Sequence, residues 1–192
     1  MYLLAMIFVA ILSNNIVLSQ FLGICPYLGT TKRIETSVGM GLAVIFVMVM
    51  SAIVTWVIDL FLLQPFSLEY LRTIVFILVI AGLVQFVEMV LKKTNPALFQ
   101  ALGIYLPLIT TNCTILGVAL LNVQSEHNII ETVVYSLATG IGFTLAMVIM
   151  AGIRERLELA NMSNYLKGAA VTLVSAGILS LAFMGFKGMV TL

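Results

Sequence analysis

The two cysteines of the chain, Cys25 and Cys113, are the residues whose type and spacing are best suited to chemistry. Each begins the pattern Cys-x-x-Leu-Gly, and each lies within a strongly apolar segment. Glycine, proline and small polar residues surround both thiols, and such residues interrupt a helix. Two thiolates supply half of the four ligands that an iron–sulfur cluster needs, and a partner chain would supply the other half. Two alternatives stay open: the cysteines only fill space between helices, or they form a disulfide.

The elements that position these cysteines are predicted to be membrane-spanning helices. The chain has 192 residues, of which 62% are hydrophobic and only 9% are charged, and its mean hydropathy is +1.19. Such values are far from those of a soluble domain. A bilayer core about 30 Å thick needs roughly 20 apolar residues per helix. Six segments qualify, at about residues 1–30, 37–63, 68–90, 96–123, 130–153 and 165–186. We therefore predict an all-α integral membrane protein with six transmembrane helices in a single domain over residues 1–192.

Composition also excludes several classes of protein. The formal net charge is +1, so the chain has no excess of positive charge with which to attract nucleic acid. It has one histidine, His127, which cannot build a histidine metal site. The sequence contains no nucleophilic triad and no phosphate-binding loop, and these absences argue against the common classes of soluble enzyme.

The basic residues predict how the chain is oriented in the membrane. Most lie in the loops that join spans one and two, three and four, and five and six. These loops hold Lys32, Arg33, Lys92, Lys93, Arg154, Arg156 and Lys167, and the other side holds only Arg72 and Lys187. Because short loops rich in Lys and Arg stay in the cytoplasm, both termini are predicted to lie on the outer side of the membrane.

The chain contains a diverged internal repeat. After the shared Cys-x-x-Leu-Gly pattern, Glu-Thr occurs at the mouth of the next span in both halves, at residues 35–36 and 131–132. Residues 1–92 therefore match residues 96–192. Because each copy has three spans, the second copy enters the membrane from the opposite side, as in inverted-repeat proteins whose sites lie on broken helices near the midplane. We predict that helices 1 and 4 are broken near the cysteines and that nearby polar side chains satisfy the freed backbone groups.

Two acidic residues, Asp59 and Glu88, lie within or near the ends of the second and third spans. Acids at membrane depth are candidates for ion relays. The alternative is an ion pair at the membrane interface, for which Glu88 has the helical spacing from Lys92 and Lys93. The charged run at residues 154–158 is interpreted as a solvated helix end or a docking surface for a partner. No acidic cluster identifies a coupling ion.

Long runs of the sequence match one family of membrane subunits. They include Asn14-Asn15-Ile-Val-Leu, Phe21-Leu-Gly-Ile-Cys25-Pro-Tyr-Leu-Gly29, Leu102-Gly-Ile-Tyr-Leu-Pro-Leu-Ile-Thr-Thr-Asn-Cys113 and Ile153-Arg-Glu-Arg156. Over essentially its whole length the chain closely resembles the RnfA/NqrE/NqrD family. Three features resemble the RnfA branch more than NqrE: the Cys25-Pro26 pair, the run that ends in Cys113, and Trp56 followed by Asp59.

This resemblance implies a subunit of the Rnf electron-transport complex, an ion-translocating ferredoxin:NAD⁺ oxidoreductase of the bacterial inner membrane. In that family RnfA pairs with RnfE, a homologous six-span subunit of opposite orientation, and the two share an intramembrane [2Fe–2S] cluster. Cys25 and Cys113 match the family's ligand positions, so the resemblance implies that they are the metal ligands of this chain. Further partners would resemble RnfB, RnfC, RnfD and RnfG. The chain would carry electrons and contribute to Na⁺ or H⁺ translocation, with no NAD site and no catalytic residue of its own.

Other roles stay open at this point. One is an NqrE-like subunit of a sodium-pumping NADH:quinone oxidoreductase. Another is a secondary ion transporter without a cofactor, in which broken helices hold the ion and the cysteines only pack. A third is a scaffold subunit without a cofactor. A regulatory role is also open, because bacterial relatives of this family have been named for reducing a redox-sensing transcription regulator. Iron content separates the cluster-bearing roles from the others.

Overall fold

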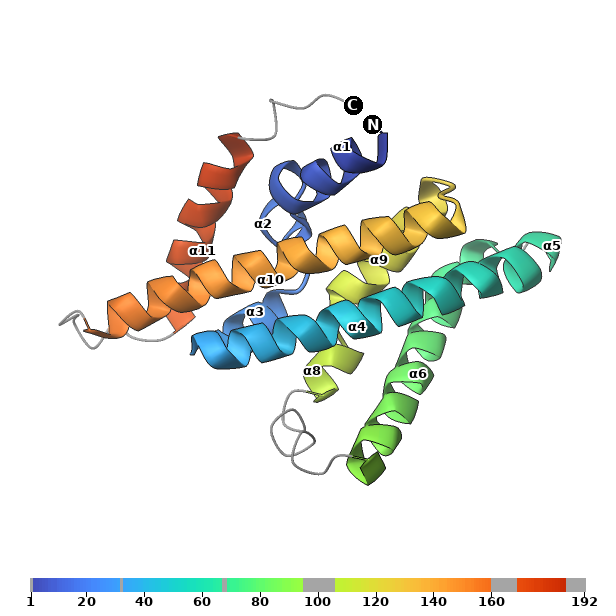
Figure 1. Cartoon of the computed structure of the whole chain (residues 1–192), viewed down its shortest axis with the longest axis horizontal. Coiled ribbons are helices and arrows are strands. Elements are labelled where there is room, and N and C mark those ends of the chain that lie inside the picture. Colours follow the sequence, from blue (N-terminus) through green and yellow to red (C-terminus); the bar gives the residue numbers. More distant parts are fainter. Residues whose placement is uncertain (1, 32, 67–68, 95–105, 160–168, 186–192) are drawn as a thin grey trace. The chain divides into compact units, whose positions relative to one another are not determined.

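The computed structural model describes residues 2–31, 33–66, 69–94, 106–159 and 169–185, and almost all of them are helical (Figure 1). The elements are α1 (Tyr2–Phe8), η1 (Val9–Ser13), α2 (Ile16–Gln20), α3 (Ile24–Thr30), α4 (Ile34–Ile58), η2 (Asp59–Leu63), α5 (Gln64–Phe66), η3 (Glu69–Leu71), α6 (Arg72–Thr94), α8 (Leu106–Thr110), α9 (Cys113–Gln124), α10 (Ile129–Leu159) and α11 (Ala169–Met184). No strand occurs in these ranges. The predicted all-α class is confirmed.

Four helical stretches are long and apolar enough to cross a membrane: Ile34–Leu63, Arg72–Met89, Pro107–Gln124 and Ile129–Leu157. They correspond to the second, third, fourth and fifth predicted spans. The described part of the sixth predicted span is a shorter apolar helix, Ala170–Met184. Residues 96–105 and 165–168 of the fourth and sixth predicted spans lie outside the described residues. The chain is therefore a helical membrane protein, and the count of six spans stays a prediction.

The first predicted span is not one helix. Its first helical stretch, α1 with η1, ends at Ser13 in a π-turn, where the N–H of Asn14 donates to the carbonyl of Val9. A second interruption follows α2, because Phe21 (φ 55°) and Gly23 (φ 84°) both adopt left-handed backbone. Glycine takes this conformation without strain. The predicted break of helix 1 near Cys25 is confirmed.

The fourth predicted span is also interrupted. Helix α8 ends at Thr110, Asn112 is extended (φ −71°, ψ 112°), and α9 begins at Cys113. The side-chain oxygen of Asn112 accepts a hydrogen bond of 3.0 Å from the N–H of Thr114, which is the standard way for Asn to cap a helix. The predicted break of helix 4 near Cys113 is confirmed.

The second span ends at Leu63, as predicted, and the helical chain continues beyond it to Phe66. It does so through η2, a π-turn in which the N–H of Gln64 donates to the carbonyl of Asp59. Because proline has no N–H, it removes one helical hydrogen bond, and the wider π-turn lets the helix pass this point without a kink that ends it.

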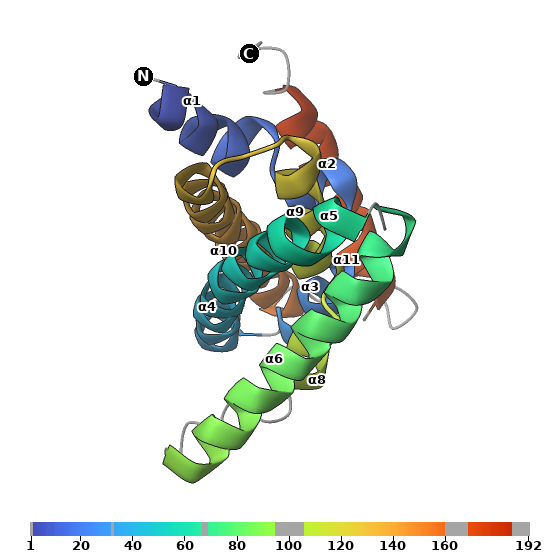
Figure 2. The ribbon, with the colours of Figure 1, turned by 90° about the vertical axis from the view of Figure 1, so that its right-hand side faces the viewer.

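The described residues fall into two compact units, 1–42 with 138–192 and 43–137. In the first unit, α11 packs against η1 and α2 (Figure 2). In the second, α6 packs against α8 and α9, and one stripe of α6 is buried at Phe76, Ile80 and Val84. The predicted single domain and the repeat of residues 1–92 and 96–192 stay predictions.

Candidate metal centre at two helix breaks

Cys25 lies in the first turn of α3, directly after the break at Phe21 and Gly23, and its side chain is exposed. The short helix is held by its own side chains. The hydroxyl of Thr30 donates to the carbonyl of Pro26 at 2.7 Å, and that of Thr31 donates to the carbonyl of Tyr27 at 2.6 Å. The cysteine is thus presented at the start of a rigid helical turn and not on a loose loop.

Arg154 of α10 fixes the other end of α3. Its Nη1 atom donates to the carbonyl of Leu28 and to the hydroxyl of Thr31, both at 3.0 Å. Beside it, the carboxylate of Glu155 accepts a hydrogen bond of 3.2 Å from the N–H of Ile34. The interpretation of residues 154–158 as a solvated helix end is wrong for Arg154 and Glu155, because both fold back onto the segment around Leu28 and Ile34. Sequence alone missed this role, since the contacting residues are more than one hundred positions away.

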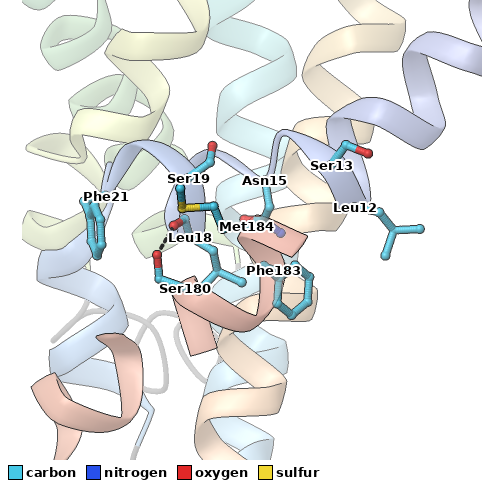
Figure 3. A pocket seen from close by; sticks show the side chains of 9 residues that line it. All are labelled: Leu12, Ser13, Asn15, Leu18, Ser19, Phe21, Ser180, Phe183 and Met184. Carbon is cyan, nitrogen blue, oxygen red and sulfur yellow. Dashed lines mark hydrogen bonds between the residues drawn. The ribbon is translucent and has the colours of Figure 1, made fainter. Parts of the chain in front are cut away.

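A second anchor holds the broken first segment from the other side. The hydroxyl of Ser180 in α11 donates to the carbonyl of Leu18 in α2 at 2.6 Å, as the dashed line in Figure 3 shows. A cavity of about 100 Å³ lies beside this contact. It is lined by Leu12, Ser13, Asn15, Leu18, Ser19, Phe21, Ser180, Phe183 and Met184 (Figure 3). The break therefore has polar partners within the chain, as membrane depth requires.

Cys113 is the first residue of α9 and is partly exposed. The residues on both sides of it carry buried polar atoms that have no hydrogen-bond partner within the described chain, the amide nitrogen of Asn112 and the hydroxyl of Thr114. The buried hydroxyl of Tyr27, two residues after Cys25, also has no hydrogen-bond partner within the described chain. Buried donors are rarely left unpaired, so each one needs an explanation.

These observations fit a sulfur-bound anionic group. Both cysteines are free of disulfides and lie at helix starts, where backbone N–H groups and the helix dipole favour negative charge. The unpaired donors flank them, and donors of this kind stabilise cluster sulfides and thiolate ligands. Among the described residues no three His, Cys, Asp or Glu side chains gather as a metal-binding group. Within the described residues, neither cysteine is therefore part of a complete metal site.

The acidic candidates fall into different settings. Asp59 is buried, and its carboxylate forms an ion pair of 2.9 Å with Nε of Arg72. Glu88 is partly exposed on α6. Of the two interpretations of the acidic residues, the ion pair therefore holds for Asp59, and its partner lies thirteen residues further along the chain.

Apolar helices interrupted at two cysteines define the chain as a helical membrane protein built around broken spans. A family model described as "Rnf-Nqr subunit, membrane protein" matches residues 3–190. The chain belongs to the Rnf-Nqr family, as the resemblance predicted.

Individual relatives are similar over nearly the whole chain. It is 57% identical over 180 residues to the A-type subunit of the Na⁺-translocating ferredoxin:NAD⁺ oxidoreductase complex of Acetobacterium woodii, covering 94% of both chains. It is 54% identical over 182 residues to the A-type subunit of the ion-translocating oxidoreductase complex of Escherichia fergusonii and 53% identical over 182 residues to that of Proteus mirabilis. Both alignments cover 95% of this chain and 94% of the relative.

Proposed function

We propose that this chain is the A-type membrane subunit of an ion-translocating ferredoxin:NAD⁺ oxidoreductase complex, the Rnf complex. It would carry electrons within the membrane and contribute to the coupling of ferredoxin oxidation and NAD⁺ reduction to Na⁺ or H⁺ translocation. The similarity to A-type subunits of such complexes supports this role. The family also includes Nqr subunits, but the three relatives named above are all A-type subunits of ion-translocating complexes.

The observation that carries the proposal is the placement of Cys25 and Cys113 in the first turns of helices that start inside apolar segments. Such breaks are costly in lipid unless they serve a site. We propose that the two thiolates hold an intramembrane [2Fe–2S] cluster. When bound, the cluster would supply a one-electron relay.

In this proposal the residues around the cysteines position the two thiols and offset the negative charge of the cluster. Arg154 holds α3 in place through Leu28 and Thr31, which fixes the position of Cys25. The cap formed by Asn112 fixes the start of α9 and hence Cys113. Unpaired donors near both thiols would offset negative charge in a medium of low dielectric constant, where an uncompensated charge is costly.

The partner in this proposal is a homologous membrane subunit of the RnfE type. Only two cysteines occur in the chain, whereas a [2Fe–2S] cluster bound by cysteines takes four thiolates. The partner would therefore supply two further cysteines, in an arrangement related to this one by opposite orientation in the membrane. RnfB-, RnfC-, RnfD- and RnfG-like subunits would complete the complex.

Electron paramagnetic resonance of the purified complex tests the proposal. The wild-type complex, reduced with dithionite, should give the signal of a [2Fe–2S] cluster that Cys25→Ala and Cys113→Ala each remove. Ser175→Ala is the matched control, because it removes one side-chain heteroatom from a partly exposed position on α11. A cluster signal that is unchanged in both cysteine variants would refute the ligand role.

A further inference from the structure

A polar pocket of about 280 Å³ lies in the second unit, and neither cysteine is among its lining residues. It is formed by the end of α4, by η2 and by the loop that joins α9 to α10. It is lined by Trp56, Asp59, Leu60, Gln64, Asn122, Val123, Glu126, His127 and Asn128. We call it the Asp59 pocket. The predicted orientation places it at the outer side of the membrane, and the proposed electron relay does not use it.

The carboxylate of Asp59 is the buried charged group of this pocket, and its side chain is only 5% exposed. One oxygen, Oδ1, accepts a hydrogen bond of 2.9 Å from Nε of Arg72. Among the described residues, the other oxygen, Oδ2, accepts one hydrogen bond, of 3.4 Å, from the amide nitrogen of Gln64. That contact is near the upper limit for a hydrogen bond. A carboxylate offers about four lone-pair sites, so Oδ2 keeps capacity for another partner.

The π-turn adds a second oxygen ligand at the same place. In a regular α-helix the N–H of Gln64 would bond to the carbonyl of Leu60. Here it bonds to the carbonyl of Asp59, and Pro65, the next possible donor, has no N–H. The carbonyl of Leu60, a lining residue of the pocket, thereby loses its regular helical donor. Freed carbonyls on interrupted membrane helices are typical ligands for Na⁺.

The opposite wall of the pocket is held in one arrangement by side-chain hydrogen bonds. The indole N–H of Trp56 donates to the carbonyl of His127 at 3.1 Å. The amide of Asn122 donates to the hydroxyl of Ser136 at 3.2 Å, and its oxygen lies 3.1 Å from Nδ1 of His127. The amide side chain of Asn128 also lines this wall. Preformed polar walls of this kind favour a specific ligand over bulk water.

Charge and ligand chemistry limit what the pocket would bind. Asp59 and Glu126 carry two negative charges, and Arg72 offsets one of them. The pocket therefore keeps one net negative charge, which a monovalent cation would neutralise. Its ligands are carboxylate, amide and carbonyl oxygens, which suit hard cations. A single histidine and no cysteine line it, which disfavours zinc or copper. A divalent cation would leave positive charge uncompensated in a partly buried site.

We propose that the Asp59 pocket binds a small hard monovalent cation, of which Na⁺ is the type, with Asp59 as its charged ligand and the Leu60 carbonyl as a second ligand. This inference deepens the proposed role in ion coupling and rests on that role for the choice of Na⁺. Arg72 competes with the cation for Asp59, so the ion pair sets how tightly the cation is held.

The fluorescence of Trp56, the only tryptophan in the chain, reports binding directly. The full-length chain in lipid nanodiscs is titrated with NaCl and, at equal ionic strength, with choline chloride. We expect a saturable change with Na⁺ alone. The change should be lost in Asp59→Asn and kept in Glu35→Gln, which neutralises an exposed carboxylate that does not line the pocket. Because this readout needs neither cluster nor ferredoxin, its failure leaves the electron-transfer proposal standing, and Cys25→Ala should not alter it.

Two further variants should change the Na⁺ affinity in opposite directions. Arg72→Gln removes the competing charge and should tighten the apparent Na⁺ affinity about tenfold. Glu126→Gln, at an exposed position of the pocket, should weaken it. Circular dichroism confirms that each variant is folded. The proposal is wrong if the folded wild-type chain shows no response specific to Na⁺, if the response survives Asp59→Asn, or if Arg72→Gln weakens binding.

Discussion

The side-chain amide of Asn15 donates a hydrogen bond of 2.7 Å to the main-chain carbonyl of Gly142 in α10. The same amide reaches the carbonyl of Ile11 at 3.2 Å, and its oxygen caps α2 by accepting from the N–H of Val17. Glycine at position 142 allows this close approach, because an added Cβ would lie 3.2 Å from the carbonyl oxygen of Ala10 and from the Cα of Ile11, and these backbone atoms would have to shift. One buried side chain thus joins the broken first segment to a long helix.

Asn15→Ala should lower the free energy of unfolding by about 2–4 kcal/mol, because it removes the side-chain hydrogen bonds to the carbonyls of Ile11 and Gly142 together with the cap of α2. The matched control is Asn14→Ala. Its side chain is partly exposed and only accepts a bond from Ser19, so the loss should be below about 1 kcal/mol. Thermal unfolding in detergent compares the two. Equal losses would show that Asn15 is not the anchor.

Two glycines of α4 should respond in opposite ways to the same substitution. An added Cβ at Gly41 would collide with the side chain of Thr144, whereas at Gly39 it would meet nothing within 4 Å. Gly41→Ala should therefore destabilise the protein by about 1–3 kcal/mol. Gly39→Ala should be neutral or stabilising by up to about 1 kcal/mol, because alanine favours a helix. Melting temperatures of the two variants check this, and a stable Gly41→Ala would contradict the close approach of Gly41 to the side chain of Thr144.

Arg154→Ala should loosen the segment that carries Cys25, since it removes the donors to Leu28 and Thr31. We expect faster maleimide labelling of Cys25 in a Cys113→Ser background. Arg156→Ala is the control, because Arg156 is exposed. Arg154→Lys should restore only part of the protection, since a lysine has no planar fork of donors. A labelling rate that is the same in the Arg154 and Arg156 variants would argue against the anchor.

Thr114→Val should shift the reduction potential of the proposed cluster to a more negative value. The substitution keeps the shape of the side chain and removes a buried hydroxyl that has no partner within the described chain. Hydrogen bonds to the sulfurs raise the potential of iron–sulfur clusters. Thr111→Val is the control, because that hydroxyl already donates to the carbonyl of Pro107 at 2.9 Å. A redox titration followed by electron paramagnetic resonance measures both, and an equal potential in the two variants would exclude Thr114 as a donor.

Sequence predicted those features that depend on local residue chemistry. Hydropathy predicts the membrane helices, and Gly23 and Asn112 predict the breaks, because each acts within a few residues of its own position. The end of the second span at Leu63 was predicted, but the π-turn from Asp59 to Leu63 that forms this end was not. Polar side chains near Cys25 were predicted to satisfy freed backbone groups, and Asn15 does so at Ile11 and Val17. The role of Arg154 and the bond from Asn15 to Gly142 were not predicted. Both join residues more than one hundred positions apart in the sequence, and only the packed chain brings them together.

If Cys25 and Cys113 are half of a shared iron–sulfur site, as we propose, this chain purified together with the proposed RnfE-type partner should contain iron and acid-labile sulfide. We expect chemical analysis to find about two iron atoms and about two sulfides for each pair of subunits, as in a [2Fe–2S] cluster, and a fall to background in Cys113→Ala. Ser175→Ala should keep both. A folded wild-type pair that contains no iron, or a Cys113→Ala pair that keeps its full content, would show that these cysteines do not hold a cluster.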